Sequence, residues 1–254
     1  MISIDALTTK GRALFLAYDQ GLEHGPVEFN DDTVDPTYIL DLAKKGEFSA
    51  VILQKGIAEK YFNPSIGVPL ILKLNGKTNL SKEEPFSPLI STVEEAKALG
   101  ASAVGYTVYV GSERQGEMLE TFGRIIRDSH AANLPVVGWM YPRGHAIKEE
   151  TPDVTAYAAR VGLEVGADIV KVKYHSDVES LKHIVASAGK TQVVFSGGSH
   201  VPEEDFLAMV RNVKASGALG MAVGRNIWQS EDPLKITQEV KKVLFSRSER
   251  LDKT

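Results

Sequence analysis

The sequence alternates short apolar runs with longer segments of mixed polarity, and this alternation continues through nearly the whole chain. The apolar runs are rich in β-branched residues and have the length of strands buried on both faces of a sheet. Turn-forming residues follow most of them. The predicted strands are Ala13–Tyr18, Ala50–Gln54, Leu70–Leu74, Ala103–Tyr106, Val136–Met140, Ile169–Lys173, Gln192–Phe195 and Leu219–Val223.

The segments between these strands have the length of helices. Asp35 and Thr151 each stand before a proline, which is a common start for a helix. The predicted helices are Pro36–Lys45, Ile57–Phe62, Thr92–Leu99, Glu117–Ala132, Thr151–Val165, Val178–Ala188, Glu203–Ser216 and Pro233–Phe245. Because a helix follows each strand, we predict one α/β domain over residues 1–254, a single (β/α)8 barrel of the TIM type.

The lengths of the predicted loops locate a functional site. Helices connect to the next strand through short turns such as Gly100-Ala101 and Gly166-Ala167. Several connections from a strand to the next helix are long, and long loops in a compact domain commonly carry function. They gather at the C-terminal ends of the strands, where such barrels hold their active sites. The long loops are predicted over residues 20–35, 75–91, 108–116 and 141–150.

Composition and charge narrow the class of protein. With 29 basic and 33 acidic residues the net charge is −4, and no basic stripe indicates nucleic acid as a partner. No apolar run approaches a membrane span and the first residues lack a signal peptide's apolar centre, so we expect a cytoplasmic protein without a membrane partner. The absence of cysteine excludes disulfides and thiolate metal sites. Since the six histidines lack ligand spacing and no nucleotide-binding glycine motif occurs, we expect neither metal nor cofactor.

Two lysines stand at the end of the sixth predicted strand. Lys171 and Lys173 are two residues apart, so their side chains lie on the same face of that strand. Amines on a buried strand are unfavourable unless they are paired or uncharged, and an uncharged amine is the nucleophile of Schiff-base chemistry. The residues alone leave both interpretations open, a pair of structural ion pairs or an imine-forming lysine.

Other candidate catalytic residues end the fifth and first strands. Trp139 and Tyr141 share a face; Tyr141 is a candidate acid or base and Trp139 a surface for substrate carbons, although both residues also suit an aromatic core. Arg143 follows in the loop, as a phosphate ligand or a surface charge. Asp19 can reach the barrel lumen and pair with a lysine, although an aspartate there also commonly caps a turn.

Glycine-rich turns end the last two strands, at Ser196-Gly197-Gly198 and Gly224-Arg225-Asn226. Barrels of this type often hold a phosphate between these two loops. Glycines let backbone N–H groups approach the anion, and Arg225 adds a charged fork. The alternative is that the glycines only form the turns, but their occurrence with an arginine one βα unit apart favours phosphate.

Together these residues resemble the archaeal-type class I fructose-1,6-bisphosphate aldolases, a Schiff-base barrel family that also includes 2-amino-3,7-dideoxyheptulosonate synthase. The resemblance extends over nearly the whole chain. It departs from the family at Gln20, where many relatives have histidine, and at Ser199-His200, where the family often has Pro-Lys. The segments that carry the resemblance are 16–26 (LAYDQGLEHGP), 55–60 (KGIAEK), 72–78 (LKLNGKT), 141–144 (YPRG), 171–174 (KVKY), 196–198 (SGG) and 222–226 (AVGRN).

The resemblance implies a metal-independent aldolase that reversibly cleaves fructose 1,6-bisphosphate to dihydroxyacetone phosphate and glyceraldehyde 3-phosphate. In that reaction Lys173 would form the imine, and Lys171 would keep it unprotonated. Tyr141 would move a proton, with Asp19 near the C4 hydroxyl and Trp139 lining the pocket. A homo-oligomer, a decamer or a pentamer, is expected from the family. The residues expected to bind the phosphorylated sugar are Gln20, His24, Arg143, Lys171, Ser196, Gly197, Gly198, Gly224 and Arg225.

Three other functions compete with this one. A 2-amino-3,7-dideoxyheptulosonate synthase-like transaldolase, or another phosphorylated-sugar aldolase, would keep the imine and change the substrate. A sugar-phosphate isomerase or epimerase would use the phosphate site without a covalent intermediate. A catalytically inactive barrel would serve assembly or binding only.

Overall fold

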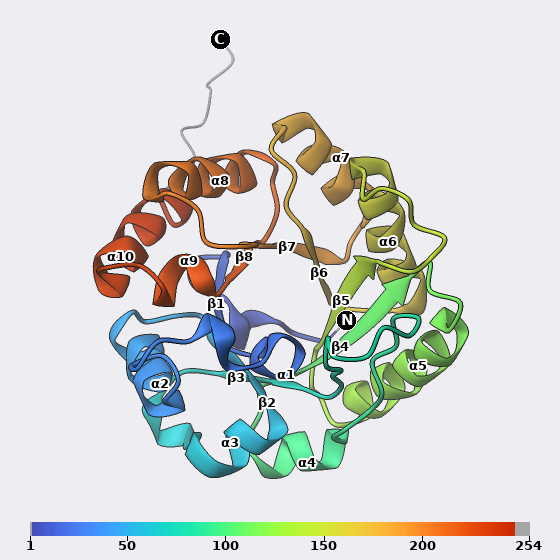
Figure 1. The fold of residues 1–254 in the computed structure, drawn as a ribbon, viewed down its shortest axis with the longest axis horizontal. Coiled ribbons are helices and arrows are strands. Elements are labelled where there is room, and N and C mark those ends of the chain that lie inside the picture. The colour runs from blue at the N-terminus through green and yellow to red at the C-terminus, as the bar shows by residue number, and fades with distance from the viewer. Residues whose placement is uncertain (1, 247–254) are drawn as a thin grey trace.

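Eight parallel strands close into a barrel in sequence order, and helices surround it (Figure 1). The computed structural model describes residues 2–246; residues 1 and 247–254 of the predicted domain lie outside the described residues. The predicted (β/α)8 barrel is thereby confirmed. The strands are β1 (Ala13–Ala17), β2 (Ala50–Gln54), β3 (Leu70–Lys73), β4 (Ala103–Val110), β5 (Val136–Pro142), β6 (Ile169–Lys173), β7 (Gln192–Ser196) and β8 (Gly220–Val223).

Strands β4 and β5 are longer than the sequence predicted. Their pairing continues through Tyr109 with Tyr141 and through Val110 with Pro142. The predicted loop over residues 108–116 is therefore wrong, because β4 occupies its first residues. Proline was expected to stop β5 before it, but Pro142 still has its register partner at this end of the sheet.

All eight predicted helices are present among the described residues. Their starts follow the expected chemistry: the side chain of Asp35 accepts a hydrogen bond from the backbone N–H of Thr37, and that of Thr151 from Val154. The helices are α2 (Pro36–Lys45), α3 (Lys55–Tyr61), α4 (Val93–Ala98), α5 (Gln115–Ala131), α6 (Pro152–Val165), α7 (Val178–Ser187), α8 (Glu203–Ala215) and α10 (Pro233–Leu244).

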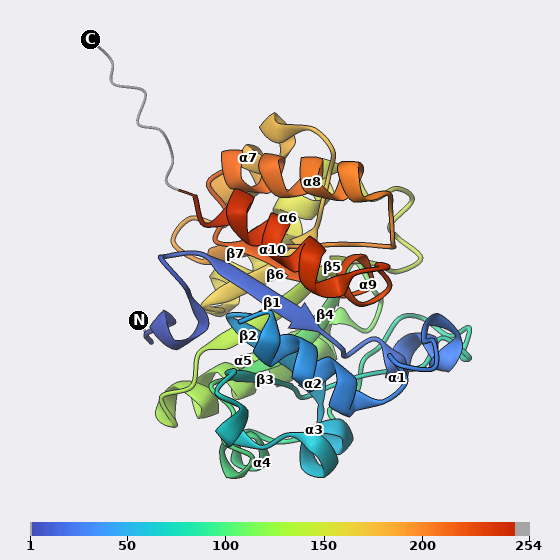
Figure 2. The same ribbon diagram turned by 90° about the vertical axis from the view of Figure 1, so that its left-hand side faces the viewer.

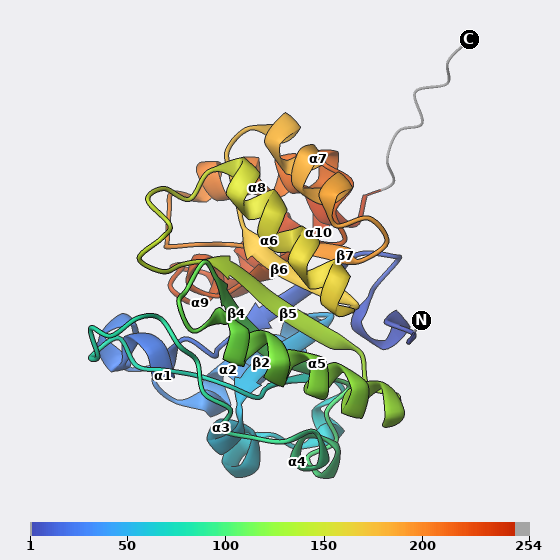
Figure 3. The same ribbon diagram turned by 90° about the vertical axis from the view of Figure 1, so that its right-hand side faces the viewer.

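The strand-to-helix loops contain short elements that periodicity did not predict. Helix α1 (Gly21–His24) and the 3-10 helix η2 (Pro26–Glu28) follow β1, and α9 (Arg225–Trp228) follows β8. In both side views α1 lies beside the loop between β3 and α4, and the N-terminus lies at the opposite end of the barrel (Figures 2 and 3). The backbone N–H of Asn79 in that loop donates to the carbonyl of Glu23 at 2.9 Å, which joins the two segments.

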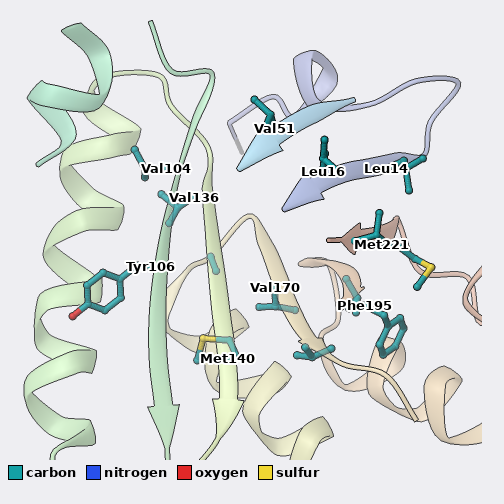
Figure 4. Close-up of a cluster of buried hydrophobic side chains, with 14 of the residues drawn as sticks. Leu14, Leu16, Val51, Val104, Tyr106, Val136, Met140, Val170, Phe195 and Met221 are labelled. Atoms are coloured by element: carbon teal, nitrogen blue, oxygen red, sulfur yellow. The ribbon is translucent and has the colours of Figure 1, made fainter. Parts of the chain in front are cut away.

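Apolar side chains form two cores, one on each face of the sheet. On β1, Leu14 and Leu16 belong to the outer core between strands and helices, part of which Figure 4 shows, whereas Phe15 belongs to the inner core. This alternation follows from the two-residue period of a strand. Trp139 belongs to the inner core and lies at the end of that core nearest the C-terminal ends of the strands.

Across residues 2–246, the helices are too short or too polar to cross a lipid bilayer.

Candidate active site

A cavity of about 340 Å³ opens at the C-terminal ends of the strands. It is lined by charged and aromatic side chains from several strands and from the loops after β1, β3, β5, β7 and β8. Every residue that we predicted to belong to a site lines this one cavity: Asp19, Gln20, His24, Trp139, Tyr141, Arg143, Lys171, Lys173, Ser196, Gly197, Gly198, Gly224 and Arg225. Residues far apart in the sequence therefore meet where the loop lengths indicated.

The two lysines of β6 have different environments, although both line the cavity. Lys173 keeps 55% of its side chain exposed, and its Nζ lies 2.6 Å from Oε2 of Glu150 in the loop after β5. This ion pair departs from the environment expected of an imine-forming lysine, and the role of Lys173 stays a prediction.

Lys171 has the environment that was expected of Lys173. The residue is only 6% exposed. Burial lowers the pKa of its amine, with a smaller contribution from the charge of Arg225, while the carboxylates of Asp19 and Glu23 oppose this effect. The Nζ atom lies 4.9 Å from the centre of the Trp139 indole, over an aromatic surface.

A third lysine, on β3, enters the same space. Lys73 is 5% exposed, and its Nζ lies 5.0 Å from the Trp139 ring centre and 3.3 Å from the carbonyl oxygen of Asn75, to which it donates. Burial, with a smaller contribution from the charge of Lys171, lowers the pKa of Lys73 to about 8, although the carboxylate of Asp19 opposes this effect. Lys73 was not among the predicted site residues. The signal was a charged residue ending an otherwise apolar run.

The indole of Trp139 has room in the lumen because β4 carries glycine opposite it. A Cβ atom at Gly105 would lie 2.3 Å from Cζ3 of Trp139 and 3.3 Å from Cδ of Lys73. A larger residue at this position would collide with the indole, which lies about 5 Å from the amines of Lys73 and Lys171. The absence of a side chain at Gly105 therefore determines where the indole can lie.

Tyr141 lies in a cationic and aromatic environment at the end of β5. Burial raises the pKa of its hydroxyl, and Asp19 raises it further, so the phenol is protonated at neutral pH. The Arg143 guanidinium carbon lies 5.5 Å from the ring centres of both Tyr141 and Tyr109. Nη1 of Arg143 also donates to Oε1 of Glu23 at 2.7 Å.

Tyr109 and Glu23 were not predicted as site residues. Tyr109 lies in a stretch that we predicted to be loop. It pairs in register with Tyr141 because β4 is longer than predicted. Glu23 lies inside the motif shared with the aldolase family, but a single glutamate after a strand gives no local signal in the sequence. The pairing of Arg143 with Glu23 joins the loop after β5 to the loop after β1.

The turns after β7 and β8 form one connected unit. Gly198 has φ of +69°, a backbone conformation that favours glycine. The side-chain amide of the buried Asn226 donates to the carbonyls of Gly197 at 2.7 Å and Ser199 at 3.0 Å, and its oxygen accepts from the N–H of Val201. Asn226 thereby fixes the glycine turn against the start of α9.

Arg225 stands beside this turn and is held by a carboxylate. Its Nη1 donates to Oε1 of Glu28 at 2.6 Å, and Oε2 of the same carboxylate lies 3.0 Å from Nδ1 of His24. Glu28, which we did not predict, lies in the loop that follows β1. An arginine fork has five N–H donors, so this contact leaves others for an anion.

Comparisons with known proteins agree with this geometry. The family model of the DeoC/LacD family aldolases matches residues 13–230. The class 1 fructose-bisphosphate aldolase of Thermoproteus tenax is 50% identical over 240 residues, which cover 93% of this chain and 90% of that protein. The class 1 fructose-bisphosphate aldolase of Halobacterium salinarum is 45% identical over 246 residues, with 95% and 94% covered.

A solved structure is similar to the whole fold. It is an archaeal fructose-1,6-bisphosphate aldolase with the catalytic lysine covalently bound to the carbinolamine intermediate of the substrate. The two chains superpose with a TM-score of 0.93 at 48% identity, covering 96% of this chain and 98% of that one.

Proposed function

Because the chain belongs to the DeoC/LacD family of aldolases, we propose that it is a class I fructose-bisphosphate aldolase. Such an enzyme cleaves fructose 1,6-bisphosphate reversibly to dihydroxyacetone phosphate and glyceraldehyde 3-phosphate through an imine, without a metal. The observation that carries the proposal is the buried amine of Lys171, whose pKa is lowered and which faces the phosphate loops across one cavity. The relatives named above support the substrate.

Lys171 is the imine-forming residue in this proposal, in place of Lys173. In dihydroxyacetone phosphate only C1 and one ester oxygen separate the ketone carbon from the phosphorus, so the nucleophile must lie near the phosphate. Lys171 is paired in register with Val194 on β7, next to the glycine turn, and is close enough to Arg225 to be affected by its charge. Lys73 lies on β3, farther round the barrel.

The reaction follows from an amine that can lose its proton. The Lys171 nitrogen attacks C2, and the former carbonyl oxygen takes up protons and leaves as water, which gives a protonated imine. That imine accepts the electron pair of the C3–C4 bond as the C4 hydroxyl loses its proton, so the aldehyde leaves and an enamine remains. Protonation at C3 and hydrolysis then return dihydroxyacetone phosphate and the free amine.

Two residues handle these protons in our proposal. Asp19, a carboxyl group at the cavity wall, takes the proton of the C4 hydroxyl. Tyr141, which is kept protonated by its raised pKa, gives a proton to C3 of the enamine and takes it back in the direction of synthesis. The buried Trp139 indole lies along the substrate carbons and excludes water from the imine.

The two phosphates occupy opposite parts of the cavity. Backbone N–H groups of the turns at Gly197, Gly198 and Gly224, with the Ser196 hydroxyl and Arg225, bind the phosphate next to Lys171. Arg143 binds the phosphate of the aldehyde half. Glu23 and Glu28 neutralise these arginines from the loop after β1, and Gln20 and His24 line the same wall.

We also propose an oligomeric state and a cellular location for the enzyme. The enzyme forms a homo-oligomer, a decamer or pentamer as the family resemblance implies, and light scattering coupled to gel filtration tests this. It works in the cytoplasm, which suits a chain without cysteine.

A coupled assay for dihydroxyacetone phosphate released from fructose 1,6-bisphosphate tests the proposed function. We expect turnover that excess EDTA leaves unchanged, since the imine is the electron sink. If aspartate semialdehyde is used as the acceptor and fructose 1,6-bisphosphate is not cleaved, the chain is the related transaldolase. If K171M keeps substantial turnover on a sugar phosphate, the chemistry is that of a non-covalent isomerase.

A further inference from the structure

Two buried lysines, rather than one, share the space around Trp139. The Nζ atoms of Lys73 and Lys171 lie 5.0 and 4.9 Å from the centre of the same indole. Both residues are at least nine-tenths buried, and Asp19 acts electrostatically on both. The mechanism above uses only Lys171, so the cost of burying a second amine needs another explanation.

We propose that Lys73 is a positioning residue for the reactive amine: it shares the carboxylate of Asp19 and repels a proton on Lys171, so that Lys171 stays free to attack the ketone. This inference rests on the proposed function and adds a residue that does not contact the reacting carbons. Without Lys73, Lys171 would be the one buried amine in this part of the cavity on which the charge of Asp19 acts.

A network of hydrogen bonds through Asn75 fixes the position of the Lys73 amine. Its ammonium donates to the carbonyl of Asn75, and Asn75 is fully buried. The Asn75 amide donates to the carbonyls of Ser87 and Thr107, and its side-chain oxygen accepts from the N–H of Thr107. This network holds the amine at the end of β3, where Gly105 leaves space for its chain.

The charges around Lys171 show why Lys73 matters. The carboxylates of Asp19 and Glu23 raise the pKa of Lys171, and the charge of Arg225 lowers it. The charge of Lys171 in turn lowers the pKa of Lys73. Because repulsion between charges is mutual, the loss of the Lys73 charge must raise the pKa of Lys171. The groups that face Lys171 are Asp19 after β1, Glu23 on α1, Lys73 on β3, Trp139 and Tyr141 on β5, and Arg225 on α9.

The test measures imine formation directly, as a function of pH. Wild type, K73M, K73Q and K73R are incubated with dihydroxyacetone phosphate and cyanoborohydride, and the trapped fraction on Lys171 is followed by mass spectrometry. The matched control is K190M, at an exposed lysine on the opposite side of the fold from the site. K73Q can still donate to Asn75, so it separates the charge from the hydrogen bond.

We expect the midpoint of the pH profile to move up by about one unit in K73M and K73Q, which lowers the trapping rate at neutral pH about tenfold. K73R keeps the charge and should stay close to wild type, as should K190M. An unchanged midpoint in both neutral variants overturns the inference, as does an equal shift in K73R. If wild type shows no trapping at all, the proposed function itself is contradicted. That outcome is distinguishable from an unchanged midpoint in the Lys73 variants.

Discussion

Glu150 binds the amine of Lys173 at 2.6 Å, whereas Lys171, two residues earlier on the same strand, lies deeper in the barrel. The ion pair holds the Lys173 amine at the cavity rim. It also connects the loop after β5 to β6. The difference between the two amines is therefore one of depth and partner, and on this difference we base the proposal that Lys171 is the nucleophile.

Substitution of each lysine separates these roles. We expect K171M to lower kcat for cleavage of fructose 1,6-bisphosphate by about 10³-fold or more, as for other nucleophiles. K173M should keep activity within about tenfold, because it removes only a partly exposed ion pair. Steady-state kinetics on both variants provide the measurement. Loss of activity in K173M with retention in K171M would reverse the assignment.

Tyr141 should act after the imine has formed. Y141F removes the hydroxyl and keeps the ring, so we expect kcat to fall about 10²- to 10⁴-fold, the usual range for a proton-transfer group. Trapping of dihydroxyacetone phosphate by borohydride should remain. If Y141F abolishes trapping as well, its hydroxyl is needed for imine formation and the proposed role is incorrect.

The two arginines should discriminate between the two phosphates. R225M should raise both the KM for fructose 1,6-bisphosphate and the dissociation constant of dihydroxyacetone phosphate, by about 10- to 100-fold for one lost charged hydrogen-bonding group. R143M should raise the KM and leave the binding of dihydroxyacetone phosphate nearly unchanged. Calorimetric titration with dihydroxyacetone phosphate distinguishes them. Equal weakening by both variants would argue against separate phosphate sites.

Gly105 should be required for packing of the Trp139 indole. G105A places a Cβ within 2.3 Å of that ring, so we expect it to lower the free energy of unfolding by about 1–3 kcal/mol and to reduce kcat. Gly123 on α5 is a matched control, since a Cβ there meets nothing within 4 Å; G123A should stabilise by about 0.5–1 kcal/mol. Denaturant unfolding measures both. A neutral G105A would show that the ring can move at little cost.

The buried amine of Lys73 should make stability depend on pH. Its pKa is about 8 in the folded protein against 10.5 when exposed, so the penalty for burying the charge is complete below pH 8 and decreases as pH rises toward 10.5. We expect K73M to be more stable than wild type at pH 7, and this difference to shrink by pH 10. Thermal unfolding across this range measures it. A difference that grows with pH would have the wrong sign.

The fold was predictable because each βα unit repeats the same signals. An apolar run, a capped helix and a glycine such as Gly166 recur along the chain, so local errors at single boundaries did not alter the topology. Strand ends also located the site, since parallel strands bring their C-terminal residues to one end of the barrel. Even residues from different loops, such as Asp19 and Arg225, therefore met as expected.

The choice between Lys171 and Lys173 was not predictable from alternation. The two-residue period gives the face of a strand but not the depth along the barrel axis, and both lysines share a face. The decisive partner, Glu150, comes from a loop whose path depends on tertiary contacts. For the same reason the carboxylates that hold the arginines, Glu23 and Glu28, were missed.

The central claim is that the Lys171 amine bonds to the ketone carbon of the substrate. Incubation with dihydroxyacetone phosphate and borohydride, followed by peptide mapping with mass spectrometry, tests it most directly. We expect the reduced three-carbon phosphate adduct on Lys171, in protein pretreated with EDTA as in untreated protein. An adduct on Lys173 or Lys73, or cleavage activity without any adduct, would contradict it.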